Sequence, residues 1–242
     1  MPELLLEILS EEIPARMQKR AGDDLKRLAC DELKKARLTF DRADAYVTPR
    51  RLTLVVDGLP EKQPDVKDER KGPQVGAPER AINGFKNSLP EGAAIQEREL
   101  KGKTFYFALV EQKGQKTENV IARIIYDVLT TFPWPKSMRW STGDLRWVRP
   151  ISDVMVLFNG EALNEPIWVS TKDSANSRII KPLLPSNITS GHRFNAPQPF
   201  SVTDFADYKA KLLEAKVMLD AAERREKIRA EAEKLVKAEG LT

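Results

Sequence analysis

The chain has 242 residues, of which 41% are hydrophobic and 31% charged, and 40 Lys and Arg against 36 Asp and Glu give a formal net charge of +4. This length predicts one large domain or two of ordinary size, and the apolar share excludes a disordered chain. One cysteine, Cys30, excludes an intrachain disulfide and a cysteine-based zinc site. Without an apolar run of about 18 residues or a basic leader, we expect no membrane span and a cytoplasmic protein.

The N-terminal residues predict a buried strand followed by a long helix. Residues 3–9 are rich in Leu and Ile, which favours the strand. Ser10, followed by Glu11 and Glu12, is typical of a helix start with a serine cap and acids in the first turn. We therefore expect a helix over residues 14–37.

Two short strands are predicted next, on either side of a rigid turn. Residues 43–48 and 51–58 flank Pro49, and apolar residues alternate with period two in the second of them. Residues 59–78 are polar and interrupted by prolines. We expect a long loop there.

The middle of the chain predicts a short helix, a hairpin and a longer helix. The helix is expected at residues 78–88 and the hairpin at 95–100 with 104–112. Residues 117–131 carry an apolar stripe at helical spacing. The stripe consists of Val120, Ile121, Ile124, Ile125 and Val128.

The C-terminal third predicts a strand, a second short strand, a loop and two helices. The strands are expected at 151–158 and 165–169, and residues 170–199 contain enough breakers for a mostly irregular segment. A helix is expected at 204–214, and a highly charged one at 220–239 that Asp220 would cap.

Together these elements predict an α+β fold with mixed or antiparallel sheets and packed helices, ending in a charged helix. Residues 1–203 would form the main region, with a division into two packed subdomains near residues 60–130. Residues 204–242 would form a helical segment. Because the last helix has the composition of a connector, we expect it to lead into a further C-terminal part.

Residues 132–150, here called the tryptophan segment, combine aromatic and basic side chains. They hold Trp134, Trp140 and Trp147 together with Lys136, Arg139, Arg146 and Arg149. Aromatic faces beside fixed positive charge suit nucleic acid, which offers both phosphate and stacking surface. Tryptophan is also a frequent core residue, so a purely structural role stays open.

Other cations stand beside prolines or glycines, which lower the cost of ordering them. Arg50 and Arg51 follow Thr-Pro, and Lys71 precedes Gly-Pro. Residues 174–203 contain no acid but include His192 and Arg193. Guanidinium groups hold phosphate with two hydrogen bonds. Several such sites without a catalytic constellation favour binding over chemistry.

Catalytic and metal interpretations find less support. Residues 102–104 resemble the end of a phosphate-binding loop, but Glu97 stands where that loop needs a glycine. His192 is the only histidine, so a hydrolase would have to pair it with Glu7 or Glu11. Glu7, Glu11 and Glu12 could also hold magnesium, although helix capping explains Glu11 and Glu12 more simply. We predict neither a catalytic residue nor a metal site.

Five motifs stand out in order along the chain: Leu5-Leu6-Glu7-Ile8 with Glu11-Glu12-Ile13-Pro14, Thr48-Pro49-Arg50-Arg51-Leu52, Lys71-Gly72-Pro73, Pro135-Lys136-Ser137-Met138-Arg139-Trp140 with Arg149-Pro150, and Gly191-His192-Arg193-Phe194. In this order they resemble the motifs of the beta subunit of bacterial heterotetrameric glycyl-tRNA synthetase. The likeness covers residues 3–225. Residues 171–185 depart from it, because this loop is longer than the family pattern.

The resemblance implies a subunit of glycine–tRNA ligase that attaches glycine to tRNA using ATP. The alpha subunit would hold the active site, with ATP and magnesium, so no cofactor is expected in this chain. The beta subunit would bind tRNA and assemble with alpha, and a second beta subunit would complete a heterotetramer. This chain would be its N-terminal portion, inactive alone.

The candidate contacts follow from these motifs. Candidates for tRNA binding are Arg50, Arg51, Lys71, Lys136, Arg139, Arg149, His192 and Arg193. Candidates for stacking or a subunit interface are Trp134, Trp140 and Trp147. The alternative is an assembly module without direct tRNA contact, since arginine and tryptophan are also enriched at protein interfaces.

Overall fold

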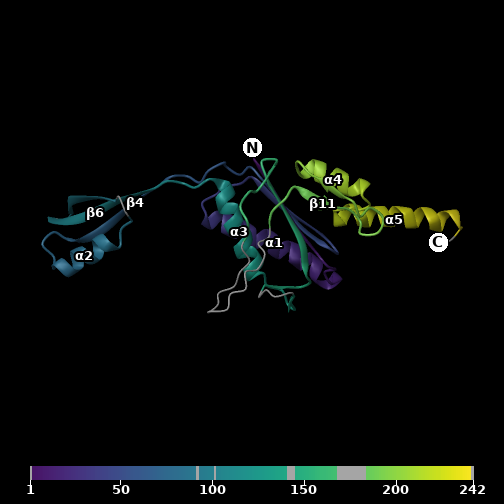
Figure 1. Ribbon diagram of the computed structural model, residues 1–242, viewed down its shortest axis with the longest axis horizontal. Helices are drawn as coiled ribbons and strands as arrows, with labels where there is room; N and C mark the ends of the chain where they lie inside the picture. The colour runs from purple at the N-terminus through teal and green to yellow at the C-terminus, as the bar shows by residue number, and fades with distance from the viewer. Residues whose placement is uncertain (1, 91–92, 101, 141–144, 168–183, 241–242) are drawn as a thin grey trace. The chain divides into compact units, whose positions relative to one another are not determined.

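The computed structural model describes residues 2–90, 93–100, 102–140, 145–167 and 184–240. The chain forms two compact units (Figure 1). Unit 1 comprises Met1–Glu61 and Thr117–Thr242, and unit 2 comprises Lys62–Lys116. Unit 2 is thus inserted into the chain of unit 1. The predicted boundary between residues 203 and 204 stays a prediction.

Unit 1 is built on a five-stranded antiparallel sheet with the order β10-β9-β1-β3-β2. Its strands are β1 (Glu3–Ser10), β2 (Arg42–Thr48), β3 (Arg51–Asp57), β9 (Ile151–Phe158) and β10 (Glu161–Ala162). The central strand β1 pairs with β3 on one side and β9 on the other, so that Leu6 lies opposite both Leu54 and Val156. The leucine-rich sequence of β1 fits this position, because its side chains are covered on both faces.

Alternation along β1 sends successive side chains to two separate cores. Leu4, Leu6 and Ile8 join the larger core with α1 (Ala15–Lys35) and α3 (Thr117–Thr131). Leu5 joins the smaller core on the other face, where α4 (Phe205–Glu214) packs. In Figure 1 the ribbons of α1 and α3 lie on one side of the strands and α4 lies on the other. Glu7 therefore lies on the α4 face of the sheet.

Smaller elements complete unit 1. These are the pair β7 (Met138–Arg139) with β8 (Arg146–Trp147), the pair β11 (Ile188–Ser190) with β12 (Pro199–Ser201), and α5 (Ala221–Ala238). Asp220 caps α5 as predicted, because its carboxylate accepts hydrogen bonds from the amides of Ala222 and Glu223.

Unit 2 consists of β4 (Val66–Gln74), α2 (Glu79–Asn87), β5 (Ala94–Leu100) and β6 (Lys103–Gln112), with the strand order β4-β6-β5. The predicted hairpin and short helix are confirmed. The loop predicted over residues 59–78 is wrong where β4 lies. The residues of this strand are mostly charged and exposed, so its sequence lacks the alternation of apolar and polar residues that predicts a strand. Its pairing with β6 supplies the extended conformation.

The start of α1 also differs from the prediction. Ser10 is the last residue of β1, the N-cap position is Pro14, and the first turn contains no acid. Pairing of Ser10 with Ile151 at the end of the sheet competes with helix capping and prevails. Glu11 and Glu12 are thereby left outside the helix and turn towards arginines.

The α+β prediction is confirmed by the helices and antiparallel sheets of the described residues. The helix at 117–131 and the strand at 151–158 are confirmed to the residue. Residues 165–167 form no strand beyond a single bridge, and 168–169 lie outside the described residues, as does most of the 171–185 loop. Within the described ranges, no helix combines the length and the apolar character needed to cross a membrane.

Candidate nucleic-acid interface

Three of the sequence motifs meet at one end of the unit 1 sheet. Because neighbouring strands are antiparallel, the end of β1, the turn between β2 and β3 and the start of β9 share this edge. The amide of Ser10 donates to the carbonyl of Arg50 (2.8 Å), and the amide of Glu11 donates to that of Pro150 (3.0 Å). Ile13 N–H donates to Pro49 in the same way (2.6 Å). Backbone hydrogen bonds therefore hold these motifs together.

Arg51 connects the fourth motif to the same edge. Its guanidinium donates to the carbonyls of Ser190 and Gly191, and its Nε lies 3.0 Å from Oε2 of Glu7. The side chains of Arg51 and Glu7 are only 3% and 2% exposed. Arg51 thus holds the 190–194 loop against the sheet and leaves little of its guanidinium for an outside ligand.

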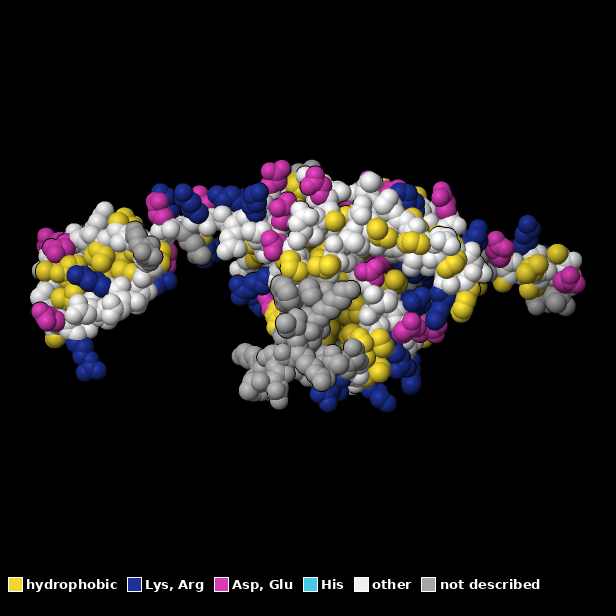
Figure 2. All heavy atoms as spheres, viewed as in Figure 1, with side chains coloured by type: hydrophobic (Ala, Val, Ile, Leu, Met, Phe, Trp, Pro, Cys, Tyr) yellow, Lys and Arg dark blue, Asp and Glu magenta, His cyan; other side chains and the backbone are white. Residues whose placement is uncertain are grey.

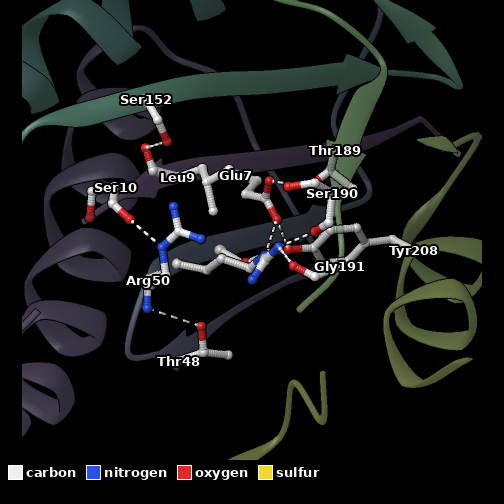
Figure 3. Close-up of polar contacts among 12 residues, drawn as sticks. Glu7, Leu9, Ser10, Thr48, Arg50, Ser152, Thr189, Ser190, Gly191 and Tyr208 are labelled. Atoms are coloured by element: carbon white, nitrogen blue, oxygen red, sulfur yellow. Dashed lines mark hydrogen bonds and ion pairs between the residues drawn. The ribbon is translucent and has the colours of Figure 1, made fainter. Parts of the chain in front are cut away.

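Glu7 is the centre of a buried polar network (Figure 3). Besides Arg51, its carboxylate accepts hydrogen bonds from the hydroxyls of Thr189 and Tyr208. Thr53 also contacts the Tyr208 hydroxyl, at 3.0 Å. Burial, with the Glu7 carboxylate nearby, raises the pKa of Tyr208 well above its usual range. These donors compensate the cost of removing a carboxylate from water.

A pocket of about 360 Å³ opens beside this network; we call it the basic pocket. Its wall comes from the β2–β3 turn, the 190–194 loop and the segment between α4 and α5. The lining residues are Glu12, Thr48, Pro49, Arg50, Arg51, Gly191, His192, Arg193, Phe194, Lys216, Val217, Met218 and Arg224. Five of them are Lys or Arg and one is an acid, so the lining favours an anionic ligand.

The charged side chains of the basic pocket are mostly positive, whereas the surface around it carries both signs of charge. On the face drawn in Figure 2, Lys and Arg side chains alternate with Asp and Glu over both units, in keeping with the small net charge. A general electrostatic attraction therefore does not mark this face as a binding surface. The local excess of cations in the pocket does distinguish that site.

Arg50 and Arg193 are held in the wall of the pocket by weak contacts. Arg50 donates from Nε to the Ser10 carbonyl (3.2 Å; Figure 3). It also lies 3.7 Å from Glu11. Arg193 lies 3.4 Å from Glu11 and 3.8 Å from Glu12. The pairs of Arg193 are solvent-exposed, and such pairs contribute only about 0–1 kcal/mol, so a ligand phosphate can compete for this arginine. Arg50 is less accessible, since only 19% of its side chain is exposed.

His192 organises the loop that carries Arg193. Its Nδ1 accepts hydrogen bonds from the amides of Phe194 (3.3 Å) and Asn195 (3.2 Å), and its own amide donates to Ala215 (2.9 Å). Among the described residues it makes no hydrogen bond to a carboxylate, so the pairing with Glu7 or Glu11 that a hydrolase would need does not form in this structure. These contacts give His192 a structural role in the turn of this loop.

Gly191 is required by close packing at the base of the loop. A Cβ at this position would lie 2.4 Å from the Cβ of Ala215 and 2.7 Å from the carbonyl oxygens of Ala196 and Ala215. Any larger residue must displace the loop or the segment after α4. This glycine therefore fixes where Arg193 and Phe194 enter the pocket.

Two cations of the pocket, Lys216 and Arg224, are not among the residues predicted from the sequence. Lys216 has a left-handed backbone (φ 64°) just after α4 and an exposed side chain. Arg224, in the first turn of α5, donates to the carbonyl of Met218 (2.6 Å). Nothing in the local sequence connects these residues with the β2–β3 turn, since only the packing of α4 on the sheet brings them there.

The tryptophan segment is mainly a core element. Trp147 is fully buried, and its ring centroid lies 4.8 Å from that of Phe132 and 5.0 Å from that of Trp134. Trp134 and Trp140 are half-buried and pack against the larger core. Trp147 thus cannot serve as a stacking surface in this structure. For this residue the structural interpretation prevails.

The remaining cationic candidates are exposed but lie outside the basic pocket. Lys136, Arg139 and Arg149 flank the core aromatics of unit 1, with Arg139 on β7. Lys71 belongs to unit 2, where its Nζ lies 3.8 Å from the centroid of the Phe105 ring. The sequence candidates therefore fall into separate groups. The group that lines the basic pocket consists of Arg50, Arg51, His192 and Arg193.

Comparison with known proteins gives consistent matches along the whole chain. Residues 4–242 match a family described as "Glycyl-tRNA synthetase beta subunit". The chain is 42% identical to the glycine–tRNA ligase beta subunit of Rhodospirillum centenum over 257 residues, covering 100% of this chain and 36% of that protein. The corresponding proteins of Cereibacter sphaeroides and a Ruegeria species are 46% and 45% identical, again over 100% of this chain but 33% and 34% of theirs. The chain spans about a third of the length of these curated relatives.

Proposed function

Because this chain belongs to the glycyl-tRNA synthetase beta subunit family, we propose that it supports the attachment of glycine to tRNA(Gly) as the N-terminal part of a beta subunit. Membership confirms the resemblance seen in the sequence. In this proposal the region binds tRNA directly and assembles with the alpha subunit.

The observation that carries the tRNA part of the proposal is the basic pocket. Motifs separated by more than a hundred residues converge there, and besides the buried Arg51 four of its side chains are Lys or Arg against one acid. Phosphate contacts from such side chains dominate the affinity of proteins for nucleic acids. A pocket with this lining therefore suits an RNA backbone.

We assign the contacts to the accessible polar side chains of the pocket. Arg50, His192 and Arg193 come from the sequence candidates, and Lys216 and Arg224 join them from the structure. Arg51 is left out, because its guanidinium is buried against Glu7 and backbone carbonyls. Lys71, Lys136, Arg139 and Arg149 stay predictions for further contacts elsewhere on the molecule.

The chemistry of glycine activation is assigned to the partner subunit. We propose that ATP and magnesium act at the alpha subunit, and that the side chains of this chain bind and position RNA without a catalytic role. A heterotetramer with a second beta subunit is the assembly we propose.

The salt dependence of tRNA binding tests the assignment. The full-length beta subunit with its alpha partner would be titrated with labelled tRNA(Gly) at several salt concentrations. Lys216→Ala and Arg193→Ala should each weaken binding and lower the slope of log K against log salt by about one. Arg20→Ala, a matched loss of an exposed arginine on α1, should leave the slope unchanged. Unchanged slopes in properly folded pocket variants would refute the assignment.

The second candidate function is an assembly module without direct tRNA contact. It is favoured by Met138, which is 38% exposed, next to the exposed Arg139 and the half-buried Trp140. Mixed aromatic, methionine and arginine surfaces are typical of protein interfaces. Under this function, Lys136→Ala with Arg139→Ala would weaken binding of the alpha subunit in a pull-down, and tRNA affinity would stay at the wild-type value.

A further inference from the structure

The basic pocket has an apolar wall in addition to its cations. Phe194 is 77% exposed and stands with Val217 and Met218 in the lining. A phosphate backbone alone gives no reason to expose an aromatic ring, since its contacts are polar. The apolar wall therefore points to a ligand that has a flat, weakly polar part next to its negative charge.

The size of the pocket limits that ligand. Its volume of about 360 Å³ falls at the lower end of the roughly 300–1,000 Å³ of typical small-molecule sites. A double helix cannot enter such a space, and the bases inside a duplex are already stacked and paired. A single unpaired nucleotide, with one base and its phosphates, is of the right order.

We propose that the basic pocket holds one unpaired nucleotide of an RNA strand. The base stacks on the Phe194 ring, and Arg193, Lys216 and Arg224 hold its phosphates. This inference rests on the proposed function, because it specifies which part of a tRNA reaches the pocket. Stacking on aromatic rings beside cations is the general means by which proteins bind single-stranded nucleic acid.

The loop is rigid enough to present Phe194 for stacking. His192 accepts the amide hydrogen bond of Phe194, and Gly191 fits where no Cβ can. The guanidinium of Arg193 lies 5.2 Å from the centroid of the Phe194 ring. One short loop, whose backbone is held by these contacts, thus supplies both an aromatic face and an adjacent cation.

The test separates stacking from charge. Phe194→Leu keeps an apolar side chain but removes the ring, whereas Phe194→Tyr keeps the ring. The full-length beta subunit with its alpha partner would be titrated with labelled tRNA(Gly) and with a short single-stranded RNA. The same RNA annealed to its complement serves as the duplex competitor. Leu213→Ala, a change of an exposed leucine that does not line the pocket, is the control.

Phe194→Leu should weaken binding of the single-stranded RNA by roughly 5- to 150-fold, the range for loss of one stacked base. Phe194→Tyr should bind like the wild type, and the salt slope should stay unchanged in both variants because no phosphate contact is lost. The duplex should compete poorly. The thermal stability of Phe194→Leu should match that of the wild type, since the ring is exposed.

Three results would overturn the inference. Wild-type RNA affinity in Phe194→Leu, while Lys216→Ala still lowers the salt slope, would refute the nucleotide pocket and leave the proposed function standing. Loss of thermal stability in Phe194→Leu would show that another part of the protein covers the ring. If both Phe194→Leu and Lys216→Ala leave RNA binding unchanged but weaken binding of the alpha subunit, the pocket binds protein, and the tRNA part of the proposed function fails together with this inference.

Discussion

Replacing Glu7 by glutamine should destabilise unit 1 by about 3–5 kcal/mol. The substitution keeps the shape of the side chain but removes the charge opposite Arg51. Both side chains are almost completely buried, at 2% and 3% exposure, and Nε of Arg51 lies 3.0 Å from Oε2 of Glu7. The guanidinium would then remain buried without a counter-charge, which is costly in a medium of low polarity.

Hydrogen bonding adds to the electrostatic loss. The Glu7 carboxylate accepts from Thr189 and Tyr208 as well as from Arg51. A glutamine offers one oxygen, and its amide nitrogen would face a donor, so at least one buried donor loses its acceptor at about 1–3 kcal/mol. That loss is part of the 3–5 kcal/mol range. The free energy of unfolding of a typical protein is about 5–15 kcal/mol, so a loss of about 3–5 kcal/mol removes a large share of the stability.

Unfolding in guanidinium chloride, followed by tryptophan emission, measures the effect. Residues 62–116 contain no tryptophan, so the signal reports unit 1 alone. Glu233→Gln, which breaks the exposed pair with Arg229 on α5, is the control and should change the free energy of unfolding by about 0–1 kcal/mol. An effect of Glu7→Gln no larger than that of the control would refute the reasoning. The double variant Glu7→Leu with Arg51→Met should lose less than Glu7→Gln, because no buried charge is left alone.

Three further predictions concern Tyr208, two glycines and the N-cap of α5. Because the pKa of the Tyr208 hydroxyl is raised in the folded state, the unfolded state loses the hydroxyl proton at a lower pH than the folded state does. The free energy of unfolding should therefore fall as the pH rises above about 10. Tyr208→Phe, which has no such proton, should show a smaller fall between about pH 9 and pH 11. Gly191→Ala should lower the free energy of unfolding by about 1–3 kcal/mol, because a Cβ at this position meets neighbouring atoms too closely. Gly84→Ala in α2 has open space around it, so it should stabilise that helix and slow the exchange of its amides. Asp220→Ala should destabilise the first turn of α5 by about 1 kcal/mol, seen as faster exchange of its amides.

Much of the fold of unit 1 could be predicted from periodicity. The stripe of α3 and the apolar run of β9 gave their bounds to the residue, because both segments bury a continuous apolar face. β4 could not be predicted in this way, since its charged residues are extended through pairing with β6. The same holds for Ser10, where strand pairing prevails over a local capping signal.

The candidate site could be predicted only in part. Motif residues such as Arg50 and Arg193 stood out because proline and glycine accompany them. Lys216 and Arg224 carry no such signal and reach the pocket through tertiary packing alone. Arg51 shows the opposite case, because a basic motif residue became an internal partner of Glu7 once β1 and β3 paired. Charge in the sequence does not tell which cations a ligand can reach.

Site-specific cross-linking tests most directly whether the basic pocket contacts tRNA. A photoreactive residue would replace Lys216 in the full-length beta subunit, within its complex with the alpha subunit and tRNA(Gly), and Arg20 on α1 would carry the same group as the control. The account predicts a covalent tRNA adduct from position 216 and none from position 20. An adduct with the alpha subunit at position 216, or equal tRNA yields from both positions, would contradict it.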